Sequence, residues 1–206
     1  MDLRVVRTRR HIQEAFLALR AQKPLERITV KELAARAEIN KATFYLHYRD
    51  IYDLSDRMEE EIIAAVMAGI THPENLIFRP SEAMRELVSA YQQHQKSIDV
   101  VFSGSQRGNL VKRIDSSVRA MIYGSYPHWR ENVQVNIILN YCIYGSYYAC
   151  MENLGQGVDA VLPTLCRFTE RTNELFPGPD GDTQQRRRGP ETPPAETAGP
   201  QARERA

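Results

Sequence analysis

The sequence predicts an all-α protein, with an N-terminal helix-turn-helix region, a larger helical body and about nine helices in total. Apolar residues recur at helical spacing along most of the chain, and no segment shows the alternation with period two that marks a strand. Two short helical segments meet at a tight turn near residue 38. Residues 1–49 hold eleven Lys or Arg against five acids, whereas residues 50–176 carry a net charge of about −5. A basic head on an acidic body is typical of a nucleic-acid-binding module attached to a second unit.

The chain has 206 residues and a formal net charge of +1. The length allows one large or two small domains with a real core, and the net charge alone indicates no partner. We expect a helix-turn-helix DNA-binding domain at 1–49 and a larger helical domain at 50–176. Residues 177–206 are rich in Pro, Gly, Gln, Glu and Arg with almost no large apolar residue, which predicts a disordered tail.

Cysteine usage and hydropathy bear on the compartment. Cys142, Cys150 and Cys166 form neither a CxxC motif nor a His/Cys metal pattern. Their odd number and the absence of a leader-like start predict a cytoplasmic protein with reduced thiols. The most apolar run, Ile137 to Met151, is too short to cross a bilayer, so no membrane partner is expected.

The first helix is expected to begin near Thr8, a candidate N-cap, and to end before Pro24. Its inward face carries Ile12, Ala15, Phe16 and Leu19 at the i, i+3, i+4 and i+7 positions. The basic residues at its start contact phosphate or form a solvated basic end, and the sequence does not separate these readings. They are Arg4, Arg7, Arg9 and Arg10.

The helix-turn-helix pattern follows. Thr29 is expected to cap a short helix, and Asn40 to cap the next one after the turn at 37–40. At about 100° per residue, Phe44 and Tyr48 share an inward face of this second helix, and Ala42 and Leu46 point outward. A small, apolar and aromatic outer face is unusual for a solvated surface and suits a helix in the major groove of DNA.

The recognition segment Thr43, Phe44, Tyr45, Leu46, His47 and Tyr48 resembles that of TetR-family transcriptional regulators, and the resemblance covers about residues 7–54. It implies that the residues facing DNA divide into phosphate contacts and base contacts. Thr29, Lys31, Lys41, Tyr45 and His47 would mainly position the protein on phosphates, and Ala42, Thr43 and Leu46 would face base edges. Lys31 and Lys41 can also reach guanine acceptors. Asn40 and Arg49 complete the expected set of DNA-binding residues.

Three positions depart from the family pattern. Glu38 stands where the turn usually has glycine, and a left-handed backbone there costs some stability. Ala42 replaces a frequent glycine and favours the helix. Ile51 replaces a lysine common at the start of the next helix, which leaves Arg49 as the nearest substitute for that phosphate contact.

The body is expected to hold a long strut helix capped by Asp50, from Ile51 to about Ile70. Later helices are expected at about 81–97, 110–123, 131–153 and 158–176, with a loop at 102–109. The resemblance implies that the last two long helices pair with their copies in a homodimer as a four-helix bundle. Their broad apolar faces agree with this, although a monomer with those faces turned inward is the simpler alternative.

No enzymatic motif stands out, and no cofactor is expected. The sequence lacks a G-x-S-x-G elbow, a phosphate-binding GxxxxGK[ST] loop and an HExxH metal motif. Ring and sulfur side chains are abundant in the body, where they form either core or a pocket for an unknown small-molecule effector. The residues favoured as pocket lining are Tyr91, His94, Met121, Trp129 and Tyr144.

The favoured function is a ligand-responsive homodimeric repressor that binds a palindromic double-stranded DNA operator. The alternative is a TetR-like co-activator or protein-interaction module that binds no specific operator by itself, which Glu38 and Ile51 keep open. A small helical enzyme is the third class considered.

Overall fold

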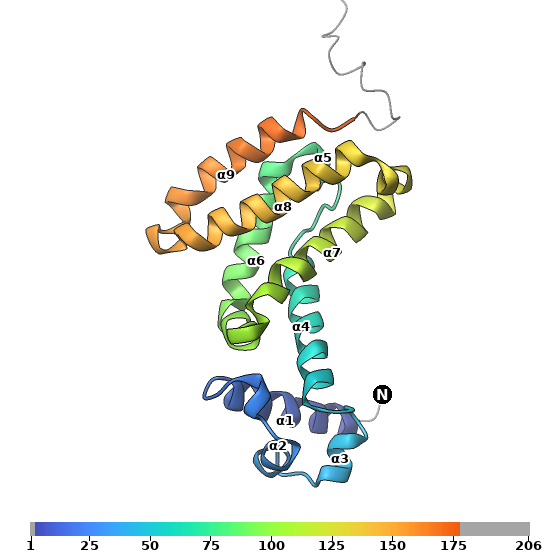
Figure 1. Ribbon diagram of the computed structural model, residues 1–206, viewed down its shortest axis with the longest axis vertical. Coiled ribbons are helices and arrows are strands. Elements are labelled where there is room, and N and C mark those ends of the chain that lie inside the picture. Colours follow the sequence, from blue (N-terminus) through green and yellow to red (C-terminus); the bar gives the residue numbers. More distant parts are fainter. Residues whose placement is uncertain (1–2, 178–206) are drawn as a thin grey trace, which may run out of the picture.

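The computed structural model describes residues 3–177, and within this range the chain forms nine α-helices and no strand (Figure 1). The predicted all-α fold is confirmed. The tail predicted from residue 177 lies, apart from Pro177, outside the described residues. The helices are α1 (Leu3–Arg20), α2 (Val30–Arg36), α3 (Lys41–Tyr45), α4 (Ile51–Met67), α5 (Asn75–Phe78), α6 (Pro80–Val101), α7 (Arg107–Ser125), α8 (Val133–Asn153) and α9 (Val158–Asn173).

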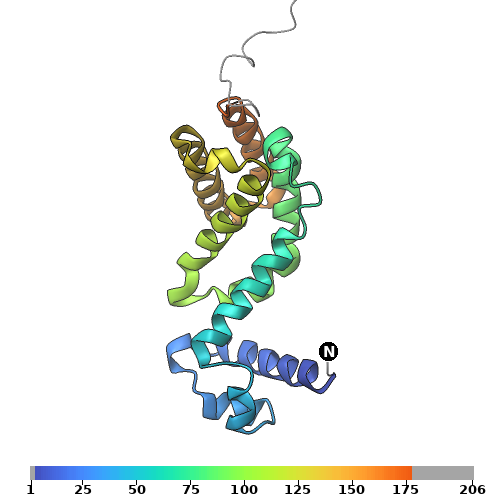
Figure 2. The same ribbon diagram turned by 90° about the vertical axis from the view of Figure 1, so that its right-hand side faces the viewer.

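The molecule is elongated, with α1, α2 and α3 gathered at one end and α8 and α9 at the other (Figures 1 and 2). We call residues 3–49 the head and residues 50–177 the body. Helix α4 rises from the head and packs against α6 and α7, and α9 packs against both α6 and α8. The head is therefore carried on a helix that is itself part of the body.

The inward face of α1 is buried as predicted, with Ile12 and Phe16 fully inaccessible to solvent. Its start differs from the prediction, because the helix already runs from Leu3 and Thr8 lies inside it. The spacing of apolar residues predicted the buried face of α1 correctly. The first two turns of the helix carry no buried apolar residue, so this spacing could not indicate where the helix begins. The basic residues from Arg4 to Arg10 are thus helical rather than an extended arm.

Two segments of the body are more helical than expected. Helix α7 begins at Arg107, within the predicted loop, after a 3-10 turn at Gly104–Gln106. A short helix, α5, precedes α6, and Pro80 occupies the first turn of α6, where its missing N–H leaves no hydrogen bond unmade. The segment between α4 and α6 therefore contains a short helical corner rather than an open loop alone.

One continuous cluster of buried apolar side chains extends from the head through the body. It includes Phe16 and Phe44 of the head, Leu54 and Val66 of α4, and Trp129. Because α4 contributes to the cluster near both of its ends, the apolar stripe of this one helix joins the two parts of the core.

A carboxylate interrupts that stripe. Glu59 on α4 is completely buried, and its Oε2 accepts a hydrogen bond of 2.7 Å from Nε of Arg113 on α7. Ser55 and Asn109 make longer contacts to the same carboxylate. Burial raises the pKa of Glu59, although the Arg113 hydrogen bond and charge oppose the rise. The pair ties α4 to α7 at one fixed position along both helices.

Arg113→Met is expected to lower the free energy of unfolding by about 3 kcal/mol at neutral pH, because it leaves the buried charge of Glu59 without its charged partner. A carboxyl whose pKa is higher in the folded than in the unfolded protein loses stabilisation as pH rises. Urea unfolding between pH 5 and pH 8 should therefore show a steeper loss of stability with pH in this variant than in the parent. The double variant Glu59→Gln/Arg113→Met is the control and should lose that additional slope; parallel profiles for the parent and Arg113→Met would contradict the assignment.

Candidate nucleic-acid interface and body cavity

The helix-turn-helix is built from local hydrogen bonds that its sequence specifies. The Thr29 side chain accepts from the backbone N–H of Glu32 at 3.3 Å and caps α2. The Asn40 side chain accepts from the backbone N–H of Thr43 at 2.7 Å and caps α3. Both predicted caps are confirmed. Between the two helices Glu38 adopts a φ of 56°, so this position has the left-handed backbone that favours glycine.

The outward face of α3 is also confirmed. Phe44 and Tyr48 are 0% and 2% exposed, and their ring centroids lie 5.7 Å apart. Leu46 is 83% exposed and Tyr45 56% exposed. Ala42 lies on the same open side. The buried pair holds the helix against the head, and this packing forces the apolar outer side chains into solvent.

Exposed cations border this face. Lys31 at the start of α2 and Lys41 at the start of α3 are exposed and form no ion pair with another described residue. Thr29 and Asn40 are exposed but are used as caps, whereas Thr43 and His47 are half-buried. The Thr43 hydroxyl donates to the Asn40 side chain at 2.9 Å. The predicted set therefore combines exposed side chains with polar atoms that already hold α2 and α3 in place.

Arg49 has a different environment from the two lysines. Its side chain is 83% exposed, and Nη2 lies 3.4 Å from the Asp53 carboxylate. The backbone N–H of Arg49 also donates to that carboxylate, and this hydrogen bond is the main cause of the lowered pKa of Asp53. Ile51, at the start of α4, is buried. Arg49 is thus the exposed cation next to this helix start.

Two contacts between head and body were not predicted from the sequence. Arg20 is only 5% exposed, and its guanidinium donates to the backbone oxygen of Val101 at 3.2 Å and to the Ser103 hydroxyl oxygen at 2.7 Å. Nearby, the Ser105 hydroxyl donates to Glu26 at 2.6 Å and lowers the pKa of that carboxyl. Arg20 follows Ile12 and Phe16 at four-residue steps, so its inward direction was readable, but its partners were not. We call the Arg20 contacts the Arg20 latch.

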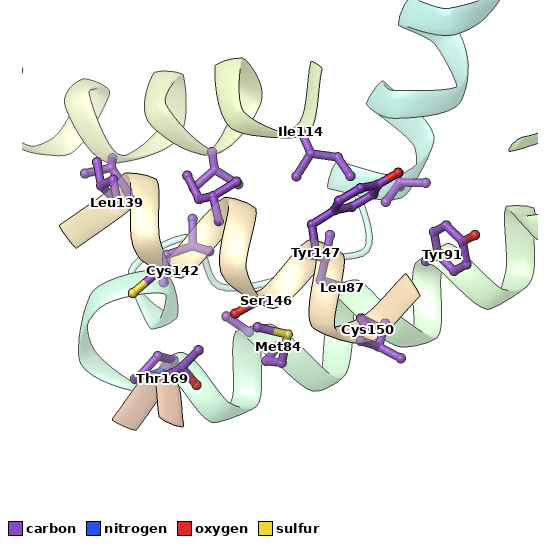
Figure 3. A pocket seen from close by; sticks show the side chains of 18 of the residues that line it. Met84, Leu87, Tyr91, Ile114, Leu139, Cys142, Ser146, Tyr147, Cys150 and Thr169 are labelled. Carbon is purple, nitrogen blue, oxygen red and sulfur yellow. The ribbon is translucent and has the colours of Figure 1, made fainter. Parts of the chain in front are cut away.

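A cavity of about 140 Å³ lies within the body, between α6, α7 and α8, and parts of α4 and α9 also line it (Figure 3). Of the five residues favoured from the sequence, Tyr91 lines it. His94 lines a separate pocket formed with α1 and α4. Trp129 is 1% exposed and stacks between Tyr126 and Phe176, with centroids at 4.5 and 5.6 Å. Met121 and Tyr144 are half-buried outside the cavity lining.

The cavity contains no charged side chain. It is lined almost entirely by aliphatic and sulfur groups, with two tyrosines and two hydroxyl residues among them. Burial raises the pKa of Tyr91 to about 12 and raises those of the Cys142 and Cys150 thiols. These groups are therefore neutral at physiological pH, and the thiols are not activated nucleophiles.

Two further features bear on the chemistry of the described part of the chain. No group of three or more His, Cys, Asp or Glu residues in it has the arrangement of a metal site. None of its helices combines the length and the apolar character that a membrane crossing requires.

The capped pair α2–α3, with its exposed outer face, defines a helix-turn-helix protein. Residues 12–58 match the family model described as "Bacterial regulatory proteins, tetR family". The chain also resembles a protein of Bacillus subtilis (strain 168) named "Uncharacterized HTH-type transcriptional regulator YxbF", with 26% identity over 143 residues. That similarity covers 62% of this chain and 38% of the relative's length. No solved structure matches. Residues 12–58 are therefore similar to the N-terminal domain of TetR-family regulators, as the recognition segment predicted.

Glu38→Gly is expected to stabilise the protein by up to about 1 kcal/mol. Relief of the left-handed backbone is worth about 1–2 kcal/mol and exceeds the entropic cost of glycine, which is about 0.5–1 kcal/mol. Chemical denaturation measures the change. Ala35→Gly, at an exposed position of the neighbouring helix, is the matched control and should instead destabilise by about 1 kcal/mol. Equal destabilisation by both substitutions would show that Glu38 is not strained.

Proposed function

We propose that this protein is a homodimeric, ligand-responsive repressor that binds a palindromic DNA operator through α3. The observation that carries the proposal is the exposure of Leu46 and Tyr45 on a short helix whose opposite side is anchored by Phe44. The match of residues 12–58 to a TetR-type N-terminal domain supports DNA as the partner of this surface. The second helix of a helix-turn-helix enters the major groove of DNA.

The chemistry of the face fits a DNA duplex. Ala42 and Leu46 offer methyl groups that can pack against thymine methyls, and Thr43 offers a hydroxyl near base edges. Lys31 and Lys41, which have no ion-pair partner among the described residues, are free to neutralise phosphates. Tyr45, His47 and Arg49 lie around the same face and would fix the orientation of the helix on the backbone.

The homodimer is supported by a second exposed surface at the far end of the body. Helix α8 leaves Val133 72% exposed and Tyr141 70% exposed, and Leu175, two residues beyond the end of α9, is 56% exposed. Gly145 of α8 has open space where a side chain would stand, so another helix can approach closely there. We call this surface the α8–α9 face. It consists of Val133, Ile137, Tyr141, Tyr148, Phe168 and Leu175.

A twofold-related pair of heads would contact half-sites about 34–36 Å apart or somewhat more. A ligand in the body cavity would change the separation of the heads, because α6 lines the cavity with Tyr91 and ends at Val101, where the Arg20 latch holds the head. Helix α4 provides a parallel connection through Val66, which also lines the cavity. Both connections join the cavity to the DNA-binding helices through packed elements.

The second candidate function is a co-activator or protein-interaction module without its own operator. It is favoured by the buried Ile51, which leaves the first residue of α4 without a cation for phosphate. A gel shift with the DNA that flanks the protein's own gene separates the two, because a co-activator alone gives no specific shift.

Tyr45→Ala is expected to weaken binding to that DNA by at least about tenfold, since one direct contact in a protein–DNA interface is worth about 1–3 kcal/mol. Titration by fluorescence anisotropy at fixed salt measures the loss. Phe78→Ala is the control, because Phe78 is similarly exposed, at 48%, but lies in the body. If Tyr45→Ala bound this DNA as tightly as the parent protein, the proposal that α3 contacts DNA would be contradicted.

Tyr141→Arg is expected to raise the dimer dissociation constant by at least about 30-fold, because truncating a central interface aromatic costs about 2 kcal/mol or more and the introduced charge adds to that loss. Light scattering during size-exclusion chromatography, repeated at several protein concentrations, measures the molar mass of the protein and so the balance between monomer and dimer. Phe78→Arg, outside the α8–α9 face, should leave the assembly intact. A parent protein that is monomeric at every concentration would contradict the proposed dimer.

A further inference from the structure

We propose that the body cavity binds a small, uncharged, apolar molecule of about one aromatic ring, and that the Ser146 hydroxyl binds the single polar group of that molecule. The inference deepens the proposed ligand response and rests on it for its effect on DNA. Binding itself is measured separately below, so the two proposals can fail independently.

The lining excludes an ionic ligand. Figure 3 shows Met84, Leu87 and Tyr91 of α6 and Cys142, Ser146 and Cys150 of α8 around the same space. No Asp, Glu, Lys, Arg or His contributes to it. A charged ligand would lose its hydration without meeting an opposite charge, and that loss is far larger than the gain from apolar contact.

Ser146 is the buried hydroxyl residue of the cavity lining that is left available. Its side chain is 7% exposed, and Oγ has no hydrogen-bond partner within the described chain. The other buried hydroxyl residue of the lining, Thr169, already donates to the backbone oxygens of Leu165 and Cys166 at 3.0 and 2.9 Å, and the two tyrosines of the lining are only half-buried. A buried hydroxyl without a partner is costly, and a ligand that supplies one recovers this energy.

The chemistry of Ser146 narrows the ligand further. A hydroxyl both donates and accepts, so it suits an alcohol, phenol or carbonyl group. Its neighbours on the same face of α8, Cys142 and Cys150, are four residues away on either side and carry neutral thiols. The polar group of the ligand is therefore expected near the middle of α8, with hydrocarbon on all sides of it.

The size of the cavity sets the size of the ligand. An engineered apolar cavity of about 150 Å³ in another protein holds benzene, and the present cavity measures about 140 Å³. Met84 and Met151 line it, and their unbranched side chains adapt to ligands of slightly different shape. One ring with a short substituent fits this volume.

The test uses the full chain and four ring compounds of similar size: p-cresol, toluene, benzoate and benzylammonium. Isothermal titration calorimetry without DNA should give binding of p-cresol and toluene, with p-cresol about fivefold tighter because of one hydrogen bond. The two ions should bind at least about 100-fold more weakly than toluene. Ser146→Ala should remove the advantage of p-cresol and leave toluene unchanged, and Ser89→Ala, at an exposed position of α6, should change neither.

A narrowing variant checks the location. Ile143→Phe, at a half-buried lining position, should weaken p-cresol and toluene alike. Binding of benzoate or benzylammonium as tight as that of toluene, or no binding of any of the four, would overturn the assigned ligand class. A p-cresol advantage that survives Ser146→Ala would overturn the role of Ser146. Binding without any change in DNA affinity would leave the ligand class standing and contradict the proposed ligand response.

Discussion

Helix α4 has to be buried twice, once against the head and once within the body, and this double burial constrains the whole molecule. Leu54 near its start and Val66 near its end belong to one continuous apolar core. Between them the stripe carries Glu59, whose buried carboxylate is stabilised by Arg113 of α7. A carboxylate can remain in such a place only while its partner stays within hydrogen-bond distance. This buried charged pair therefore helps to fix the position of α4 along α7, and the head moves with α4.

The head is also held at a second point, which limits how it can move. The Arg20 latch joins the end of α1 to the end of α6, and the Ser105–Glu26 hydrogen bond lies beside it. A tilt of α4 alone would pull Arg20 away from the backbone oxygen of Val101 and leave a buried guanidinium with unmade hydrogen bonds. Any coupled motion therefore involves α6 together with α4, and both helices line the cavity.

The sequence predicted those parts of the structure that depend on neighbouring residues. Thr29, Asn40 and Asp50 were assigned as caps because a cap bonds to a backbone N–H three residues on, and each is found in that role. The start of α1 and the corner helix α5 were missed, since no local signal marked them. Trp129 was expected in a pocket and instead lies in the core, because its stacking partner Phe176 is 47 residues away in the chain and no spacing rule connects them. Ser146 was overlooked for the same reason. Whether its hydroxyl has a hydrogen-bond partner depends on how the helices of the body pack, and the spacing of residues in the sequence does not reveal this.

Helix α8 brings the remaining features together, because it carries apolar residues around its whole circumference. One side, with Cys142 and Ser146, lines the cavity, and Asn136 and Asn140 are bonded to Arg119 of α7. Another side presents Tyr141 to solvent in the single chain. A helix that is hydrophobic all round is normally buried all round. In the proposed dimer the α8–α9 face would meet its copy, and the same helix would then touch the ligand on one side and the partner subunit on the other. A shift of α8 by a bound ligand would reach the dimer axis directly, without passing through the head.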